Sequence, residues 1–133
     1  MKSIHFICRG NVYRSRLAEA LARSILEEKN RAKISSSGIE AKKALNGDVS
    51  AETVRLLSEE NLRHYLYPVW RQTTQEVIED NELIVFMSQT LYAQAKEMFK
   101  IPKDKVQVWN IPDKDGVYPD IKNKVAELLQ DDL

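Results

Sequence analysis

The chain has 133 residues, of which 43% are apolar and 30% are charged, a balance typical of one soluble globular domain. Its 20 basic and 20 acidic residues cancel, so the charge does not favour binding to nucleic acid or to an acidic membrane surface. The single cysteine cannot form an internal disulfide, no apolar run is long enough to span a membrane, and the N-terminus does not resemble a signal peptide. We therefore expect one domain over residues 1–133, located in the cytoplasm.

Strands and helices are predicted to alternate along the chain. Short apolar runs predict strands at residues 3–8, 33–37, 82–87 and 105–109. Apolar spacing and the candidate N-caps Ser50 and Ser88 predict helices at residues 15–28, 50–60, 74–80, 88–99 and 118–129. Residues 39–49, 61–71 and 110–116 show no clear period and are expected to form loops. This order favours a three-layer α/β/α fold, in which helices cover both faces of a parallel sheet.

The first predicted strand ends at Cys8, and the residues after it have the composition of an anion-binding loop. Ligands of parallel α/β sheets bind beyond the carboxyl ends of the strands. Gly10 allows unusual backbone dihedrals and Asn11 tolerates the left-handed region, so the loop can point successive N–H groups inward. The next helix adds its dipole, and the guanidinium of Arg14 can bind two phosphate oxygens. We expect inorganic phosphate or a similar oxyanion to bind here.

Cys8 lies at the base of this loop. The positive surroundings that attract a phosphate also stabilise a thiolate, which is a nucleophile at neutral pH. Ser15 is placed to donate its hydroxyl to the sulfur, Arg9 is expected at the rim, and Arg16 is expected on the solvated surface. A lone cysteine is more often a core residue. However, Gly, Asn, Arg and Ser at the second, third, sixth and seventh positions after Cys8 favour the nucleophile.

The segment from Cys8 to Ser15 resembles the C-x5-R-S phosphate loop of the low-molecular-weight protein tyrosine phosphatases. Weaker similarities occur at residues 36–38, 82–87 and 111–113. The resemblance implies a flavodoxin-like sheet in the strand order 2-1-3-4. It also implies hydrolysis of phosphotyrosine in a phosphorylated protein substrate, in two steps through a phosphocysteine and with no cofactor or metal.

The same resemblance implies a role for each site residue. Cys8 would be the nucleophile, Arg14 would bind the phosphate, and Asp113 would protonate the leaving phenolate and then activate water. The implied phosphate-binding residues are Arg9, Gly10, Asn11, Val12, Tyr13, Arg14 and Ser15. The family usually has Asp-Pro at the acid, whereas Lys114 follows Asp113 here, so Asp115 remains an alternative general acid.

Two departures from the family pattern affect the predicted chemistry. Many members have a second cysteine where Tyr13 stands; without it, we expect peroxide to oxidise Cys8 irreversibly. The aromatic substrate wall has no clear counterpart in residues 39–45; Tyr118 is the nearest candidate for a second wall residue, and Tyr13 partly fills the role. His64 is interpreted as a surface residue.

Other functions share parts of this pattern. Protein arginine phosphatases carry Thr at the position of Val12, which instead resembles the Ile of the tyrosine phosphatases. Thioredoxin-coupled arsenate reductases need additional cysteines, which this chain lacks. A phosphate-binding module with little turnover would not need Cys8. A phosphotyrosine phosphatase is therefore the leading hypothesis, with the arginine phosphatase and the binding module as alternatives.

Overall fold

The computed structural model describes residues 2–26, 32–43 and 47–130. In this part of the chain, a four-stranded parallel sheet has the order β2-β1-β3-β4, which confirms the expected topology. Its strands are β1 (Lys2–Cys8), β2 (Ala32–Gly38), β3 (Leu83–Phe86) and β4 (Val106–Val108).

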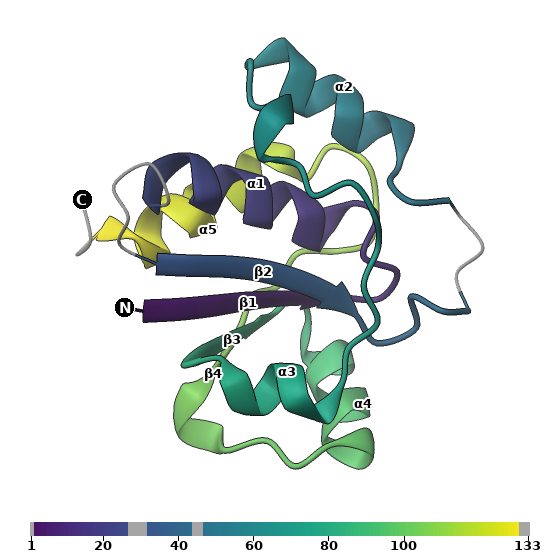
Figure 1. The fold of residues 1–133 in the computed structure, drawn as a ribbon, viewed down its shortest axis with the longest axis vertical. Coiled ribbons are helices and arrows are strands. Elements are labelled where there is room, and N and C mark those ends of the chain that lie inside the picture. Colours follow the sequence, from purple (N-terminus) through teal and green to yellow (C-terminus); the bar gives the residue numbers. More distant parts are fainter. Residues whose placement is uncertain (1, 27–31, 44–46, 131–133) are drawn as a thin grey trace.

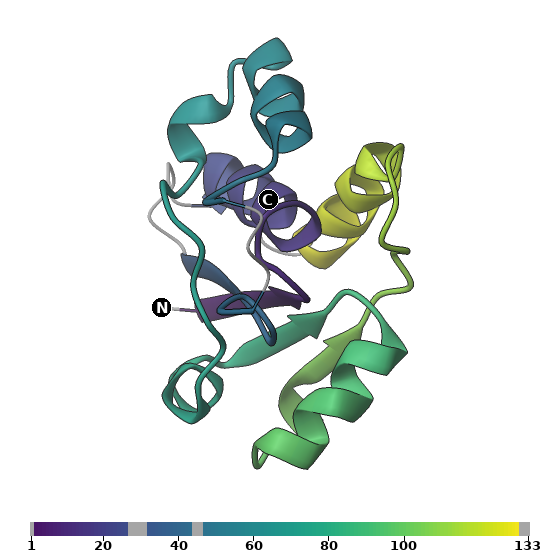
Figure 2. The ribbon, with the colours of Figure 1, turned by 90° about the vertical axis from the view of Figure 1, so that its right-hand side faces the viewer.

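Helices cover both faces of this sheet. They are α1 (Arg14–Leu26), α2 (Ala51–Glu59), α3 (Gln75–Asp80), α4 (Gln89–Met98) and α5 (Tyr118–Leu128), with short 3-10 helices η1 (Arg63–Tyr65) and η2 (Lys103–Lys105). Helices α1 and α5 lie on one face and α3 and α4 on the other, while α2 packs outside α1 (Figures 1 and 2). The expected three-layer α/β/α fold is confirmed.

The element boundaries differ from the predicted ones by only a few residues. Both predicted N-caps are present: the Ser50 hydroxyl accepts a hydrogen bond from the Thr53 N–H (3.1 Å), and the Ser88 hydroxyl accepts one from the Leu91 N–H (3.3 Å). Residues 27–28 of the predicted first helix and residues 44–46 of the predicted loop lie outside the described residues.

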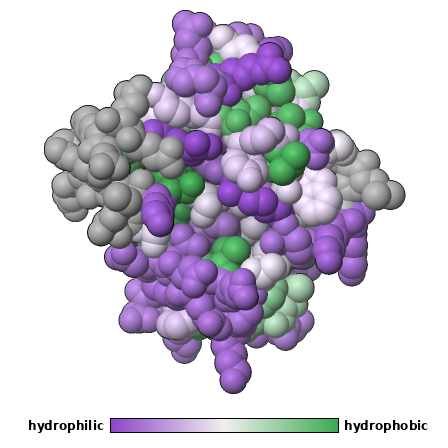
Figure 3. Space-filling model, viewed as in Figure 1, coloured by the Kyte–Doolittle hydropathy of each residue, from purple (hydrophilic) through white to green (hydrophobic). Residues whose placement is uncertain are grey.

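The central strand β1 is buried on both faces, as expected when helices cover a parallel sheet on each side. Ile4, Phe6 and Ile7 are fully buried, and the Phe6 ring packs against Trp109 with the ring centroids 5.5 Å apart. On the face shown in Figure 3, polar residues predominate and apolar residues form only small patches. Among the described residues, no helix has the length and apolar content needed to cross a membrane.

The sheet order brings the end of β1 to the place where a ligand is expected. The chain connects β1 to β2 on one side and continues to β3 on the other, so the order reverses beside β1. Crevices at such reversals, beyond the carboxyl ends of the strands, are the usual ligand sites of open α/β sheets. Cys8 is the last residue of β1, paired with Gly38 at the end of β2. The loop that follows Cys8 lies at the right of Figure 1.

Candidate active site

A small cavity opens above Cys8 at the carboxyl edge of the sheet. Its volume is about 110 Å³, and it is lined by Cys8, Arg9, Gly10, Val12, Tyr13, Arg14 and Asp113. All seven belong to the predicted site. Asn11 and Ser15, also predicted, are fully buried next to it. The cavity contains Asp113 and not Asp115, so it brings together the nucleophile candidate and one of the two acid candidates.

The phosphate loop (residues 8–15) holds its backbone carbonyls away from this cavity. Five of them accept hydrogen bonds from other groups: Cys8 from Ile39 N (3.1 Å), Arg9 from Glu40 N (2.9 Å), Asn11 from Arg16 Nη1 (2.8 Å), Val12 from Ser50 N (3.0 Å) and Thr53 Oγ1 (2.7 Å), and Tyr13 from Leu17 N (2.9 Å). In a planar trans peptide, the C=O and the following N–H point in opposite directions. Outward carbonyls therefore leave a row of N–H groups facing the cavity, which is a nest for an anion.

Asn11 shapes the turn of the phosphate loop. Its φ is 57°, the left-handed conformation that asparagine tolerates, so this expectation is confirmed. Gly10 does not have a positive φ, so the unusual dihedral expected there falls on Asn11 instead. The Asn11 side chain is held on both ends: Nδ2 donates to Ser15 Oγ and to Ser36 Oγ (2.9 Å each), and Oδ1 accepts from Arg71 N (2.8 Å).

The Cys8 sulfur is hydrogen-bonded to Asn11 and to Ser15. The Asn11 N–H donates to Sγ at 3.2 Å, and Ser15 Oγ lies 2.9 Å from Sγ. Because Ser15 Oγ already accepts from the Asn11 amide, its own proton can point to the sulfur. This arrangement suits a thiolate, which can only accept hydrogen bonds. Cys8 is 3% exposed, so the sulfur is reached only through the cavity.

Arg14 connects the phosphate loop to the segment that carries Asp113. The first residue of α1, it is buried, and its Nη1 donates to the Ile111 carbonyl at 2.8 Å. Its Nε lies 3.8 Å from Asp113 Oδ1, although the Asp113 side chain remains 63% exposed. Arg14 therefore positions the acid segment as well as closing one side of the cavity.

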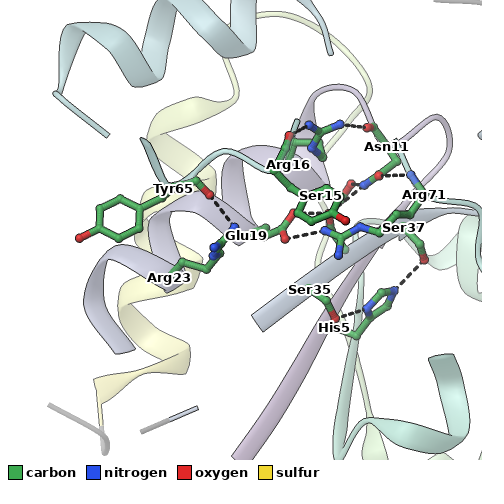
Figure 4. A network of polar contacts seen from close by, with 12 residues as sticks. His5, Asn11, Ser15, Arg16, Glu19, Arg23, Ser35, Ser37, Tyr65 and Arg71 are labelled. Atoms are coloured by element: carbon green, nitrogen blue, oxygen red, sulfur yellow. Dashed lines mark hydrogen bonds and ion pairs between the residues drawn. The ribbon is translucent and has the colours of Figure 1, made fainter. Parts of the chain in front are cut away.

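A buried polar network supports the phosphate loop from behind, and sequence reasoning did not identify it. The Ser36 hydroxyl donates to Glu19 Oε1 (2.6 Å), and Glu19 Oε2 forms an ion pair with Arg71 Nη2 (2.6 Å). Figure 4 shows Glu19, from α1, and Arg71, from the segment before α3, close to Asn11 and Ser15. Little in the sequence indicated this burial, because three residues one turn from Glu19 on the same helix, Ser15, Arg16 and Arg23, are polar.

Arg16 is a correction to the sequence analysis. It was expected on the solvated surface, but it is fully buried and donates hydrogen bonds to the backbone carbonyls of Asn11, Asp48 and Tyr67. Arg9 is exposed and lines the cavity, in agreement with its expected place at the rim.

The aromatic residues agree in part with expectation. Tyr13 lines the cavity, and burial, followed by the charges of Asp115 and Glu52, raises the pKa of its phenol. Tyr118 does not line the cavity: it is 6% exposed and its hydroxyl donates to Glu60 Oε2 at 2.9 Å, so its expected place at the substrate wall is wrong. His64 is exposed, as interpreted. Among the described residues, no three His, Cys, Asp or Glu side chains gather closely enough to hold a metal ion.

A parallel α/β sheet whose first strand ends in a cysteine, at the base of an anion nest closed by an arginine, defines a cysteine-based phosphatase. Comparison with family models agrees. The model of the low molecular weight phosphotyrosine protein phosphatases matches residues 3–116, and the chain belongs to this family. A comparison with curated proteins finds no significant match.

Solved structures show the same fold. A low molecular weight protein tyrosine phosphatase from Bacillus subtilis has a TM-score of 0.76 and 27% identity, covering 96% of this chain and 92% of that one. The YwlE arginine phosphatase, in a cysteine-to-serine mutant with a phosphorylated active-site serine, has a TM-score of 0.76 and 26% identity over 96% and 91% of the two chains. SP-PTP from Streptococcus pyogenes has a TM-score of 0.84 but 19% identity over 100% and 94%, and shows the fold alone.

Proposed function

We propose that this enzyme hydrolyses phosphotyrosine in proteins through a phosphocysteine intermediate. The observation that carries the proposal is the outward fixing of the phosphate-loop carbonyls, which turns their N–H groups toward the space above the Cys8 sulfur. A phosphoryl group bound by those N–H groups and by Arg14 would place its phosphorus in front of Sγ. Arg9 at the rim would attract the dianion.

The proposed reaction has two steps. In the first, Cys8 Sγ attacks phosphorus, the S–P bond forms, the bond to the phenolic oxygen breaks, and Asp113 gives that oxygen its proton. In the second, Asp113 accepts a proton from water, the water oxygen bonds to phosphorus, and the S–P bond breaks. The hydrogen bonds from Ser15 and from the Asn11 N–H stabilise the leaving thiolate. The phosphorylated serine at the active site of the YwlE mutant supports a covalent step at the equivalent side chain.

The first test is hydrolysis of p-nitrophenyl phosphate between pH 5 and 8 in the presence of EDTA, with the wild type and Cys8→Ser. We expect turnover by the wild type and none by Cys8→Ser, while Cys8→Ser still binds inorganic phosphate. Folded wild type that binds phosphate without turnover would instead establish the binding-module alternative. Turnover retained by Cys8→Ser would reject a cysteine nucleophile.

A protein arginine phosphatase is the second candidate, because YwlE is among the structures that match with more than a quarter of residues identical. The discriminating position is Val12, whose apolar side chain lines the cavity. We expect a higher kcat/KM on phosphotyrosine peptides than on phosphoarginine peptides of the same sequence. Val12→Thr is the matched variant, and it should move this ratio toward phosphoarginine. A wild type that prefers phosphoarginine would select the second candidate.

A further inference from the structure

Arg16 is a fully buried cation whose hydrogen bonds join three segments of the chain. It lies in the first turn of α1, and its Nη1 donates to the carbonyl oxygens of Asn11 (2.8 Å) and Asp48 (2.7 Å). Its Nη2 donates to the carbonyl of Tyr67. Figure 4 shows the guanidinium next to Asn11. One side chain thus links the phosphate loop to the segments before α2 and after η1.

Of the three hydrogen bonds of Arg16, the one to the Asn11 carbonyl affects the active site. Because the peptide between Asn11 and Val12 is trans and planar, holding the Asn11 oxygen at Arg16 points the Val12 N–H the opposite way, toward the cavity. Asn11 has a left-handed φ of 57°, a sparsely populated conformation in which the following peptide needs support from its surroundings. The Asn11 side chain is fixed by Ser15, Ser36 and Arg71, but its carbonyl is fixed by Arg16.

The positive charge of Arg16 favours an anion at the site, as its hydrogen bond to the Asn11 carbonyl does. Burial lowers its pKa, and the Arg71 charge adds to that effect, whereas the charges of Glu19, Cys8 and Asp48 oppose it. The Cys8 sulfur is therefore within electrostatic reach of the guanidinium. Burying a cation costs free energy, so three carbonyls and two nearby carboxylates are needed to retain it.

We propose that Arg16 is a positioning residue for the reaction: it holds the Asn11 peptide so that the Val12 N–H faces the bound phosphoryl group. This inference rests on the proposed function only in assuming that the phosphate loop binds an oxyanion. Arg16 does not line the cavity, and it acts through the Asn11 peptide. The fully buried side chain is therefore part of the anion site without touching the anion.

The first measurement uses Cys8 as a reporter of the anion site, because it is the only cysteine in the chain. At one pH, the folded protein is alkylated at Cys8 with anionic iodoacetate and, separately, with neutral iodoacetamide. The quantity compared between variants is the ratio of the first rate to the second. We expect Arg16→Met to lower this ratio about tenfold or more, because the guanidinium charge and its hydrogen bond to the Asn11 carbonyl are both lost. If Arg16→Met does not fold, Arg16→Gln serves the same purpose, because its side-chain amide can donate a hydrogen bond to some of the buried carbonyls.

Arg23→Met is the matched control. Arg23 lies two turns further along α1, and its Nη1 donates to the Tyr65 carbonyl (2.9 Å) in the same segment that Arg16 holds at Tyr67 (Figure 4). The Arg23→Met substitution therefore removes an arginine that is bonded to the same segment, but it leaves the hydrogen bond between Arg16 and Asn11 in place. We expect its alkylation ratio to equal that of the wild type, even if its stability falls.

The second measurement separates geometry from charge. In protein labelled with ¹⁵N-valine, inorganic phosphate should shift the Val12 amide resonance of the wild type and of Arg23→Met. In Arg16→Gln the shift at saturating phosphate should fall to less than half. A folded Arg16 variant with a wild-type alkylation ratio, or with the full phosphate-induced shift at Val12, would overturn the inference. Neither readout requires turnover, so an absence of phosphatase activity in the wild type would reject the proposed function without deciding this inference.

Discussion

Gly38 packs directly against the backbone of the phosphate loop. A methyl group on its α-carbon would lie 2.5 Å from the carbonyl oxygen of Arg9 and 2.7 Å from the nitrogen of Asn11. Both atoms belong to the backbone, and the Arg9 carbonyl is held by Glu40 N at 2.9 Å, so neither can swing aside as a side chain would. The end of β2 therefore sets the position of the loop that follows β1, and only a glycine allows this approach.

We expect Gly38→Ala to push the phosphate loop away from β2. Overpacking of this kind costs about 1–3 kcal/mol of unfolding free energy. Displacement of the loop N–H groups should also lower kcat/KM for p-nitrophenyl phosphate by about tenfold or more. Urea unfolding and steady-state kinetics measure the two effects, and Gly38→Ser should be worse than Gly38→Ala. Full activity in a folded Gly38→Ala protein would show that the loop tolerates displacement.

Asp113 is expected to be the general acid and base. It lines the cavity and its Oδ1 lies 3.8 Å from Arg14 Nε, so Asp113→Asn should lower kcat about 100-fold, within the usual contribution of proton transfer. The loss should be larger for phenyl phosphate than for p-nitrophenyl phosphate, because phenolate is the poorer leaving group and needs the proton more.

The control for this prediction is Asp115→Asn. Asp115 does not line the cavity, and we expect Asp115→Asn to hydrolyse both substrates at close to the wild-type rate. The opposite ranking of the two variants would assign the proton transfer to Asp115. Circular dichroism of both variants checks that neither substitution has unfolded the acid segment.

His5 should make the protein less stable as the pH falls. Burial in the centre of the sheet, with the Arg71 charge adding, lowers the pKa of His5 from 6.5 to about 3. The folded protein therefore keeps His5 neutral while the unfolded chain takes up a proton below pH 6.5, so stability is present above pH 6.5 and is lost as the pH falls toward 3. We expect a loss of about 2 kcal/mol in the free energy of unfolding between pH 7.5 and pH 5.

Two variants isolate this effect in urea titrations. His5→Gln removes the ionisable ring whose nitrogens lie 2.6 Å from Ser35 Oγ and 2.7 Å from Ser37 Oγ, so it should be less stable at pH 7.5 but much less dependent on pH. His64→Gln replaces the other histidine, which is exposed, and should keep the wild-type slope. A wild-type slope in His5→Gln would contradict the assignment.

Peroxide should inactivate the enzyme irreversibly. Cys8 is the only thiol in the chain, so its sulfenic acid has no internal thiol to form a disulfide and proceeds to the sulfinic acid. We expect that dithiothreitol added after prolonged peroxide exposure restores little activity. We also expect that bound phosphate protects Cys8 from oxidation. Tyr13→Cys places a thiol in the cavity wall beside Cys8 and should make the inactivation reversible. Full recovery of the wild type, without an external thiol adduct, would disprove the prediction.

The fold and the residues that line the cavity were predictable because their signals are local, whereas the contacts that support the phosphate loop from behind were not. Alternating apolar runs and Ser caps identified the strands and helices, and the C-x5-R-S spacing identified Cys8 and Arg14. The burial of Arg16 could not be predicted from the sequence, because its three hydrogen-bond acceptors are backbone carbonyls, which any residue type supplies. Tyr118 was misplaced for a similar reason: its partner Glu60 is 58 residues away in the chain.

The partners that fix the anion site come from distant parts of the chain. Arg14 bonds a carbonyl 97 residues further on, at Ile111, and the Asn11 side chain bonds the backbone of Arg71, 60 residues further on. During synthesis on the ribosome, Arg14 therefore emerges long before the carbonyl that orients it. A nascent chain halted before Ile111 should contain the complete C-x5-R-S segment and yet fail to trap vanadate, so catalytic competence begins late in translation.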